Sequence, residues 1–268
     1  MASTESYYDK RAPNYDAGFD TLLFKVYDEI TWRYLEPYVP SSPNALVLDA
    51  GGGTGRWAVR MAKKGCRVVL LDISEGMLSV AREKAASEGL RHLVDVKKGD
   101  ISELTYPEET FDMVLCEHAL FLFEDQDSIV KELVRVLKKK APIVISAQNR
   151  YVQSLAHLPD DPVLEKVVQA LNILSGVEHD AMTPDGALEI HSLTPDEFRA
   201  LLERNGLHIE KIICKGVTTP LRFAPQFVMK KEYSKDIFDK ILQLELAFCE
   251  RKDALALAAH LQAIAYKL

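Results

Sequence analysis

The sequence is poor in cysteine and has no long apolar run. Its 268 residues include 4 cysteines, which lie far apart and form no C-x-x-C pair. Neither a zinc site nor a disulfide framework is therefore expected, and buried reduced thiols are the simpler interpretation. No apolar run approaches the roughly 20 residues that span a bilayer, and residues 1–10 lack the basic and apolar parts of a secretory signal. We expect a soluble, cytoplasmic protein with no membrane contact.

Positive charge is also scarce. The chain has 33 Lys and Arg against 40 Asp and Glu, which gives a formal net charge of −7. Because a large nucleic-acid surface usually carries a basic field, we do not expect nucleic acid as the partner, although a small basic groove is not excluded. The run Lys138–Lys140 is interpreted as the solvated end of a helix. With 47% hydrophobic residues, the chain can bury one sizeable core.

Glycine is infrequent, with 13 residues, but it is concentrated in the segment VLDAGGGTGRWAVRMAKKG, Val47–Gly65. The apolar run at 45–48 predicts a buried strand that ends at Asp49. The glycines between Gly51 and Gly55 allow a tight turn and a close approach to a ligand. Residues 56–64 have helical spacing, so this loop opens onto a helix N-terminus, whose free N–H groups suit a carboxylate or phosphate.

A second apolar strand ends at Asp72, where a carboxylate can accept both hydroxyls of a ribose. A dinucleotide fingerprint would place a third glycine where Arg56 and Trp57 stand. Asp49 would also repel a pyrophosphate, whereas it could help to hold an ammonium group. A ligand with an adenosine end and an amino-acid end, S-adenosylmethionine, therefore fits better than a nicotinamide dinucleotide, and a nicotinamide-dependent oxidoreductase remains a rival.

These motifs resemble those of class I S-adenosylmethionine-dependent methyltransferases, in particular the group that includes the ubiquinone/menaquinone-biosynthesis enzymes. The resemblance covers about residues 7–150 well and the C-terminal third more loosely. It is carried by LDAGGGTG, LDIS, GDISEL and FDMVLCEHALFLFED. The segment VRVLKKKAPIVIS is similar to the R-V-L-K-P-G-G segment of that family, but Lys139, Lys140 and Ala141 replace the proline and glycines. The turn there must be built differently.

Alternating strands and helices predict an α/β fold, a parallel sheet with helices on both faces. Expected strands cover residues 45–49, 68–72, 93–97, 112–116, 142–147, 208–215 and 260–267. Expected helices cover residues 22–38, 56–64, 75–88, 126–138, 162–175, 195–206 and 236–257, with Thr194 as the N-cap of the helix at 195. The resemblance implies a Rossmann-like, doubly wound sheet, mostly parallel with an antiparallel seventh strand, in the order 3-2-1-4-5-7-6.

We expect a single methyltransferase domain over residues 1–268. Residues 1–40 should form an N-terminal helical cover, because the segment YYDKRAPNYD resembles one that folds over the cofactor in the family. The segments 151–190 and 217–234 are too long for ordinary connections and are interpreted as inserted lid or substrate-binding segments. The helix at 236–257 could pack on a second subunit, so a homodimer is possible.

S-adenosylmethionine makes specific demands on the residues that bind it. The backbone from Asp49 through Ala50 to Gly51 should face the methionine amino group, while Gly53 and Gly55 make room for the methionyl and ribose parts. Asp72 should hold the ribose hydroxyls, with Ile73 against the adenine. Asp100 could accept a hydrogen bond from the adenine amine, and the Ile101 backbone could reach a ring nitrogen. The remaining expected cofactor-binding residues are Arg56, Met77, Glu117, Tyr7 and Tyr15.

Some of these residues have a second interpretation. Asp100 could be only a turn residue, and Arg56 could pair with the ligand carboxylate or equally only cap the helix surface. Glu117, after the fourth strand, should border the transferred methyl group or the methionyl end. The apolar run Leu120–Phe123 fits the core better than a substrate pocket.

Methyl transfer from a sulfonium is downhill, so alignment for in-line displacement should supply most of the rate. A general base is needed only if the acceptor loses a proton early. The candidates for catalytic roles are His118, Asn149 and Tyr15, with His191 and Arg150 nearby in the expected layout. For each histidine, a hydrogen-bonded structural role is an equally good interpretation. No metal is expected.

The sequence favours an enzyme that methylates a small molecule and releases S-adenosylhomocysteine. A tRNA or RNA methyltransferase is an alternative, against which the acidity counts. A subunit that binds S-adenosylmethionine without turnover is another, because binding motifs do not report on catalysis. The same fold serves many acceptors, so the acceptor is not identified.

Overall fold

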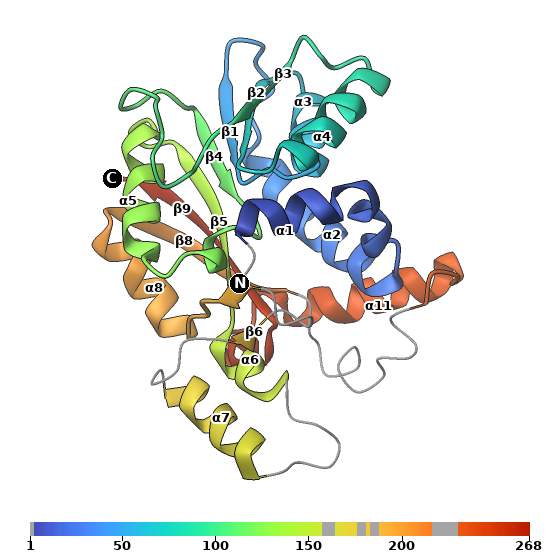
Figure 1. Cartoon of the computed structure of the whole chain (residues 1–268), viewed down its shortest axis with the longest axis vertical. Coiled ribbons are helices and arrows are strands. Elements are labelled where there is room, and N and C mark those ends of the chain that lie inside the picture. Colours follow the sequence, from blue (N-terminus) through green and yellow to red (C-terminus); the bar gives the residue numbers. More distant parts are fainter. Residues whose placement is uncertain (1–2, 157–163, 176–180, 183–187, 216–229) are drawn as a thin grey trace.

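The computed structural model describes residues 3–156, 164–175, 181–182, 188–215 and 230–268. Its centre is a seven-stranded sheet in the order β3-β2-β1-β4-β5-β9-β8 (Figure 1). The strands are β1 (Leu46–Ala50), β2 (Arg67–Asp72), β3 (Val94–Lys98), β4 (Met113–Cys116), β5 (Pro142–Gln148), β8 (Leu207–Lys215) and β9 (His260–Lys267). Strands β1 to β5 pair in parallel, and β9 runs antiparallel between β5 and β8.

This topology confirms the predicted order 3-2-1-4-5-7-6, since β8 and β9 are the sixth and seventh strands of the sheet. The two intervening numbers belong to a separate antiparallel pair, β6 (Ala181–Met182) and β7 (Glu189–Ile190). In β1 and β4 every position but the first of β1 is buried, which explains why they read as continuous apolar runs.

Helices cover both faces of the sheet (Figure 1). Helices α5 (Gln126–Val136) and α8 (Pro195–Arg204) pack on one face, in the same hydrophobic cluster as β4 and β5. The other face is covered by α2 (Leu22–Leu35), α3 (Arg56–Ala62), α4 (Glu75–Ser87) and α11 (Lys235–Cys249). The remaining described helices are α1 (Thr4–Arg11), α6 (Arg150–Ala156) and α7 (Leu164–Ser175), with 3-10 turns at 12–14, 16–19, 36–38, 120–122 and 252–257.

Local sequence signals explain several helix starts. The predicted cap of α8 is confirmed, because the Thr194 hydroxyl accepts from Glu197 N–H at 3.2 Å and the Glu197 carboxylate accepts from Thr194 N–H at 2.8 Å. Ser74 caps α4 in the simpler way, by accepting from Met77 N–H. Both caps hold helices that follow strand ends.

The continuous helix expected at 236–257 is wrong. Helix α11 ends at Cys249, and residues 252–257 form a separate 3-10 turn. Cys249 is buried in the cluster with α2, whereas Ala254 and Ala258 are buried in the cluster of α5 and α8 on the opposite face. The chain therefore crosses the edge of the sheet between them, which one straight helix cannot do.

Two other helices are shorter than expected. The helix from Leu22 becomes a 3-10 turn after Leu35, at the proline of the Glu36–Tyr38 segment, because proline cannot donate the next helical hydrogen bond. Helix α5 stops at Val136, so the lysine run lies in the turn to β5 and not on the helix. Lys140 has a φ of +61°. It thus adopts the left-handed conformation that glycine favours, at a position where the related segment has glycine.

All four cysteines are buried and have free thiols, as expected. Among the helices of the described part of the chain, none is both long and apolar enough to cross a membrane. Much of the predicted lid segment 151–190, and most of 217–234, lies outside the described residues.

Candidate functional site

A cavity lies where the carboxyl ends of β1, β2 and β4 meet the N-terminal segment. It is lined by Thr4, Tyr8, Tyr15, Gly51, Gly53, Asp72, Ile73, Met77, Gly99, Asp100, Ile101, His118, Ala119, Leu122 and Phe123. The structure thus brings together nine of the residues that the sequence singled out. Six others, Tyr7, Asp49, Ala50, Gly55, Arg56 and Glu117, are not part of its lining, and neither is Asn149.

The glycine loop after β1 forms one wall of the cavity. Gly51 N–H and Gly52 N–H both donate to Leu71 O, at 2.8 and 3.1 Å, which joins the loop to the end of β2. A Cβ on Gly51 would lie 2.5 Å from the Ala119 Cβ, so the loop packs tightly there. At Gly53, whose φ is +53°, a Cβ would meet no atom within 4 Å. Gly53 therefore faces open space inside the cavity.

Asp72 ends β2 and holds two loops in place. Its Oδ2 accepts a hydrogen bond from Gly53 N–H at 2.9 Å, and its Oδ1 accepts from Ser74 N–H at 2.9 Å. Burial raises the pKa of this carboxyl, and these N–H bonds counteract the shift. A carboxylate fixed in this way is preorganised to accept further donors from a ligand in the cavity.

Asp49 lies behind the glycine loop. Its side chain is buried, accepts a hydrogen bond from Ala58 N–H in the first turn of α3, and leaves Oδ2 without a partner. Burial raises the pKa of Asp49 to about 7. Contact with a ligand would have to come through the backbone of the loop, because the Asp49 side chain does not line the cavity.

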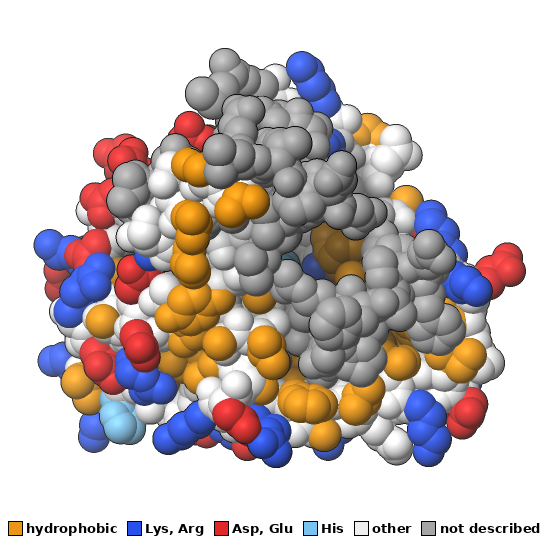
Figure 2. All heavy atoms as spheres, turned by 90° about the horizontal axis from the view of Figure 1, so that it is seen from below, with side chains coloured by type: hydrophobic (Ala, Val, Ile, Leu, Met, Phe, Trp, Pro, Cys, Tyr) orange, Lys and Arg blue, Asp and Glu red, His pale blue; other side chains and the backbone are white. Residues whose placement is uncertain are grey.

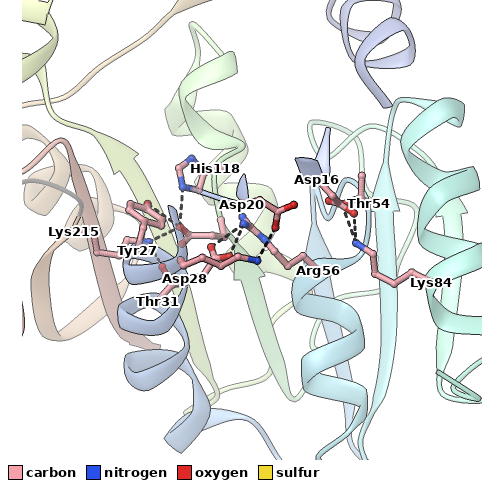
Figure 3. A network of polar contacts seen from close by, with 12 residues as sticks. Asp16, Asp20, Tyr27, Asp28, Thr31, Thr54, Arg56, Lys84, His118 and Lys215 are labelled. Carbon is pink, nitrogen blue, oxygen red and sulfur yellow. Dashed lines mark hydrogen bonds and ion pairs between the residues drawn. The ribbon is translucent and has the colours of Figure 1, made fainter. Parts of the chain in front are cut away.

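Arg56 is engaged within the protein. Its guanidinium pairs with Asp28 at 2.8 Å and lies 4.1 Å from the centre of the Phe19 ring (Figure 3). Arg56 thus has partners in α2 and in the N-terminal segment, and it does not line the cavity.

The N-terminal segment covers the cavity with two tyrosine rings. Tyr8 and Tyr15 line it and lie 6.2 Å apart, whereas Tyr7 packs against the edge of Tyr8 and under Arg11. Asp9 fastens the segment to α4, since its Oδ1 accepts from the Ser74 hydroxyl at 2.6 Å and from Gly76 N–H at 2.9 Å.

A second carboxylate of this segment binds the loop and α4. Asp16 accepts from the Thr54 hydroxyl at 2.6 Å and from Lys84 at 2.7 Å (Figure 3). Three elements that are distant in the sequence are thereby tied together at the rim of the cavity.

The far end of the cavity is formed by residues after β3 and β4. Asp100 and Ile101 line it, and Asp100 Oδ1 also accepts from Ser102 N–H at 2.8 Å, as a turn residue would. The apolar run Leu120–Phe123 after β4 contributes to both the core and the cavity. Leu120 and Phe121 are buried in the protein, whereas Leu122 and Phe123 line the cavity. The interpretation of this run as core was therefore correct for only part of it.

A buried polar network lies beside the cavity, at the ends of β4 and β8 (Figure 3). Lys215 donates to Glu117 Oε1 and, at 3.2 Å, to the Thr31 hydroxyl. The Tyr27 hydroxyl donates to the same Glu117 oxygen at 3.3 Å. Burial lowers the pKa of Lys215 and raises that of Tyr27. Glu117 is thus held in a pair and a hydrogen bond inside the protein, with Oε2 left unpartnered.

His118 links this network to the cavity. Its Nε2 is buried 3.4 Å from Glu117 Oε1, while the side chain keeps 23% of its surface exposed and lines the cavity. Its ring centre lies 4.7 Å from that of His260 and 5.1 Å from that of Tyr27. Burial and the positive charges of Lys215 and Arg56 hold the pKa of His118 well below its usual value, so this ring is neutral.

The other catalytic candidates have partners elsewhere. The Asn149 amide donates to Leu255 O at 2.7 Å, and its oxygen accepts from Tyr151 N–H. Arg150 pairs with Glu197 at 2.8 Å. His191 is not part of the cavity lining. Within the described residues, no three His, Cys, Asp or Glu side chains are grouped as a metal site would require.

Sequence reasoning missed several contributors. Tyr8 was part of the recognised segment, but only the phase of α1 decides that Tyr8 and not Tyr7 faces inward. Lys215 and His260 stand opposite each other at the ends of β8 and β9, a pairing that depends on strand register. Lys215 could have been noticed in the sequence, because it directly follows the apolar run Ile212–Cys214. An unpaired charge at a buried strand end is costly, so a lysine at this position predicts a buried acidic partner.

Comparison with known proteins agrees with this geometry. Residues 48–145 match the family model for a methyltransferase domain. The chain is 34% identical over 152 residues to the ubiquinone/menaquinone biosynthesis C-methyltransferase UbiE of Hydrogenovibrio crunogenus, covering 55% of this chain and 59% of that protein. It is 31% identical over 148 residues to the demethylmenaquinone methyltransferase of Bacteroides fragilis, covering 53% of this chain and 58% of the relative. The chain thus spans less than two thirds of these relatives.

Solved structures share the fold at low identity. A putative S-adenosylmethionine-dependent methyltransferase from Listeria monocytogenes superposes with a TM-score of 0.62 at 19% identity, over 88% of this chain and 96% of that one. The [4+2]-cyclase SpnF superposes with a TM-score of 0.56 at 19% identity, over 88% and 80%. The predicted resemblance is confirmed: residues 48–145 match the model of a methyltransferase domain, and the sheet has the fold of class I S-adenosylmethionine-dependent methyltransferases.

Proposed function

We propose that this protein is an S-adenosylmethionine-dependent methyltransferase that acts on a small molecule. The observation that carries the proposal is the cavity that Asp72 and Gly53 line together, where a fixed carboxylate stands next to open space above a left-handed glycine. A nucleoside with an amino-acid tail has ribose hydroxyls that can donate to the carboxylate, and its amino-acid part can fill the space above the glycine. The domain match over residues 48–145 supports the same ligand.

The residues of the cavity suit the two ends of S-adenosylmethionine. Asp72 would accept the ribose hydroxyls, while Asp100 and the Ile101 backbone would meet the adenine edge and Ile73 and Met77 its faces. Gly51 and Gly53 would leave room for the methionyl part. Tyr15, with Tyr8, would close the cavity from the N-terminal side. Four further residues do not line the cavity and would only help to position the residues that do: Tyr7, Ala50, Gly55 and Arg56.

The bound cofactor would supply a methyl group on a positively charged sulfur. The protein would contribute alignment and exclusion of water, because rings and apolar side chains line most of the cavity and Asp9 and Asp16 hold the N-terminal cover over it. Holding two reactants in line replaces a bimolecular encounter by an effectively unimolecular step. No metal has a part in this proposal.

A small acceptor is favoured over RNA. The net charge of −7 gives no basic field for a nucleic-acid backbone. The two curated relatives are named as quinone-biosynthesis methyltransferases, which also suggests a small acceptor. We infer one methyltransferase domain over residues 1–268, with 1–40 as its cover and the segments at 151–190 and 217–234 on the acceptor side, and a cytoplasmic enzyme. A homodimer through α11 stays a prediction.

A non-catalytic or differently reacting binding protein is the second candidate. The similarity to a [4+2]-cyclase of the same fold favours keeping it, because fold does not fix the reaction. Turnover distinguishes the two: a methyltransferase forms S-adenosylhomocysteine in the presence of an acceptor mixture.

Calorimetry tests the cofactor directly. The purified protein should release or absorb heat on titration with S-adenosylmethionine and S-adenosylhomocysteine, and should show no response to NAD. Thermal unfolding should shift upward with either adenosyl compound, because a ligand that binds only the folded state stabilises it. A shift with NAD and none with the adenosyl compounds would contradict the proposal.

A further inference from the structure

His118 is held in an unfavourable backbone conformation exactly where the cavity meets the buried network. Its φ is +59°, in the left-handed region that non-glycine residues rarely occupy. The backbone N–H of His118 donates to the Ser146 hydroxyl at 2.9 Å, which fixes the bend after β4. Strain of this kind persists where the surroundings impose it, and it often marks a functional position. Here its effect is to place an imidazole ring in the cavity wall.

Four rings from distant parts of the chain meet at this point. The His118 ring centre lies 4.7 Å from that of His260, 5.1 Å from Tyr27 and 6.5 Å from Phe121, and Tyr27 lies 5.3 Å from His260. We call these four residues the ring wall. His118 and His260 are only partly buried, whereas Tyr27 and Phe121 are buried behind them. The ring wall therefore offers aromatic surface and two imidazole edges to a molecule beside the cavity.

The surroundings of the ring wall carry no net charge. Lys215 is paired with Glu117, and Arg56 with Asp28, so each charge has a partner (Figure 3). Burial and nearby positive charge hold the pKa values of both histidines well below normal, so the rings are neutral. A charged acceptor group would find no uncompensated counterion here, and its desolvation would be costly.

Several polar atoms at this place lack a partner. They are Glu117 Oε2, His118 Nε2, His260 Nδ1 and Gln148 Oε1, all buried. Gln148, His260 and Lys215 stand side by side at the ends of β5, β9 and β8, because Gln148 pairs with His260 and His260 pairs with Lys215 in the sheet register. These atoms have almost no accessible surface, so they lie behind the part of the His118 ring that faces the cavity.

Figure 2 shows the molecule from the side of α6 and α7. Hydrophobic side chains gather on the described part of this face, with acidic and basic side chains around them.

We propose that the ring wall binds an uncharged acceptor with a flat apolar body and a hydroxyl group at the atom to be methylated, and that His118 takes up the hydroxyl proton. This inference rests on the proposed function and specifies its acceptor side. Glu117, whose carboxylate lies 3.4 Å from His118 Nε2, is a positioning residue, because it stabilises the imidazole once that ring is protonated.

The step balances in atoms and electrons. The acceptor oxygen forms a bond to the methyl carbon, and the carbon–sulfur bond breaks with its electron pair left on sulfur. The hydroxyl proton passes to His118, from which it leaves to solvent. As the methyl group leaves, the positive charge on sulfur disappears, and the imidazole becomes easier to protonate than it is beside the sulfonium.

Binding of three phenols tests the acceptor class without turnover. 4-Methylphenol, 4-hydroxybenzoate and tyramine carry the same hydroxyl group with no charge, a negative charge and a positive charge. Each is titrated into the complex with S-adenosylhomocysteine while the imidazole NMR signals of His118 and His260 are followed, with exposed His92 as the reference. We expect 4-methylphenol to shift both signals and to bind at least ten times more tightly than the charged probes. Equal binding of a charged probe, or no response of His118 to any probe, overturns the acceptor class.

Two variants test the proton role. His118→Gln keeps a hydrogen-bonding side chain but cannot accept a proton, so kcat with 4-methylphenol should fall about 100-fold or more while KM changes less than about threefold. S-adenosylhomocysteine affinity is measured alongside, and the control His92→Gln should match the wild type throughout. Undiminished kcat in His118→Gln, or binding of 4-methylphenol by the wild type without turnover, overturns the proton role. Failure of the wild type to bind S-adenosylhomocysteine would instead contradict the proposed function.

Discussion

Asp9 and Ser74 join two parts of the chain that are 65 residues apart: the Asp9 carboxylate accepts a hydrogen bond from the Ser74 hydroxyl at 2.6 Å. Ser74 is itself the N-cap of α4, and Asp9 also accepts from Gly76 N–H in the same turn. A negative group at a helix N-terminus is favourable because the free N–H groups there carry partial positive charge. The N-terminal cover is therefore fastened beside Asp72, the residue proposed to hold the ribose.

Removing this fastening should loosen the cover more than it affects the rest of the fold. In Asp9→Ala the first turn of α4 loses an acceptor, at a cost of about 1–2 kcal/mol. Affinity for S-adenosylhomocysteine should fall by about 5- to 30-fold, the equivalent of that energy, and amide exchange should quicken in α1. Calorimetry and hydrogen exchange measure the two effects.

The control is Glu5→Gln. Glu5 lies on α1, like Asp9, and the substitution removes its exposed ion pair with Lys98 at the end of β3. Exposed pairs contribute little, so this variant should bind like the wild type. Equal losses in both variants would mean that α1 acts only through its general charge and not through the Asp9 contact.

Alanine substitutions at two glycines distinguish an effect on folding from an effect on cofactor binding. Gly53 and Gly89 both have positive φ, +53° and +72°, and a Cβ on either would meet no atom within 4 Å. Alanine should therefore cost each site a similar backbone strain of about 1 kcal/mol. Only Gly53 faces the cavity. Gly53→Ala should abolish measurable cofactor binding while Gly89→Ala binds normally, with the two unfolding free energies similar. If Gly53→Ala still binds, the ligand does not occupy the space above this glycine.

How much of the molecule was predictable depends on the distance over which a residue acts. The positions of the first strands and the glycine loop follow from local signals, because apolar runs, Asp49 and the glycines next to it all lie within one strand–loop–helix unit. The strand order, in contrast, came from the resemblance to the methyltransferase family. The cap at Thr194 is likewise written in four adjacent residues. The sequence was sufficient wherever neighbours along the chain are also neighbours in space.

The buried network was not predictable in the same way. Lys215, Thr31 and Glu117 come from β8, α2 and the end of β4, and their meeting depends on how α2 crosses the sheet. The predicted end of helix α11 was wrong for a related reason. The periodic sequence pattern continues past Cys249, but the chain passes to the other face of the sheet, where Ala254 is buried in the other hydrophobic cluster. Local periodicity cannot report such a crossing.

Asp72 gives the most direct test of the cofactor site. Asp72→Ala removes the carboxylate that would accept the ribose hydroxyls, and affinity for S-adenosylhomocysteine should weaken by about 1–3 kcal/mol. In the wild type the Asp72 carboxylate also accepts hydrogen bonds from Gly53 N–H and Ser74 N–H, and the alanine variant leaves both donors without this partner. Asp72→Asn keeps one acceptor oxygen for these loops and serves as the matched variant.

The two variants should differ in one respect. Asp72→Asn should lie closer to the wild type in unfolding free energy than Asp72→Ala, and both should bind weakly. Calorimetry and urea denaturation provide the two measurements. Wild-type affinity in either variant would show that Asp72 does not hold the ligand.

Asp49 should make stability depend on pH in a direction opposite to most carboxylates. Burial raises its pKa to about 7 in the folded protein, with the negative charges of Asp72 and Glu117 acting the same way. The folded state therefore binds more protons than the unfolded state, so stability falls as pH rises from about 4 to about 7. The shift is equivalent to at most about 4 kcal/mol. Asp49→Asn, which stays neutral and can still accept from Ala58 N–H, should lose this slope.

Urea denaturation of the unliganded protein at pH 5 and pH 8 measures the effect, as the difference between wild type and Asp49→Asn. Asp112 supplies the opposite case, because hydrogen bonds from Lys138 and Leu46 N–H outweigh its burial and lower its pKa. Its contribution should be lost only as pH falls below about 4, so Asp112→Asn should leave the slope between pH 5 and pH 8 intact. If Asp49→Asn also retains the wild-type slope, the buried carboxyl is already ionised at pH 5, and the Ala58 N–H together with the first turn of α3 must stabilise its charge more strongly than burial opposes it.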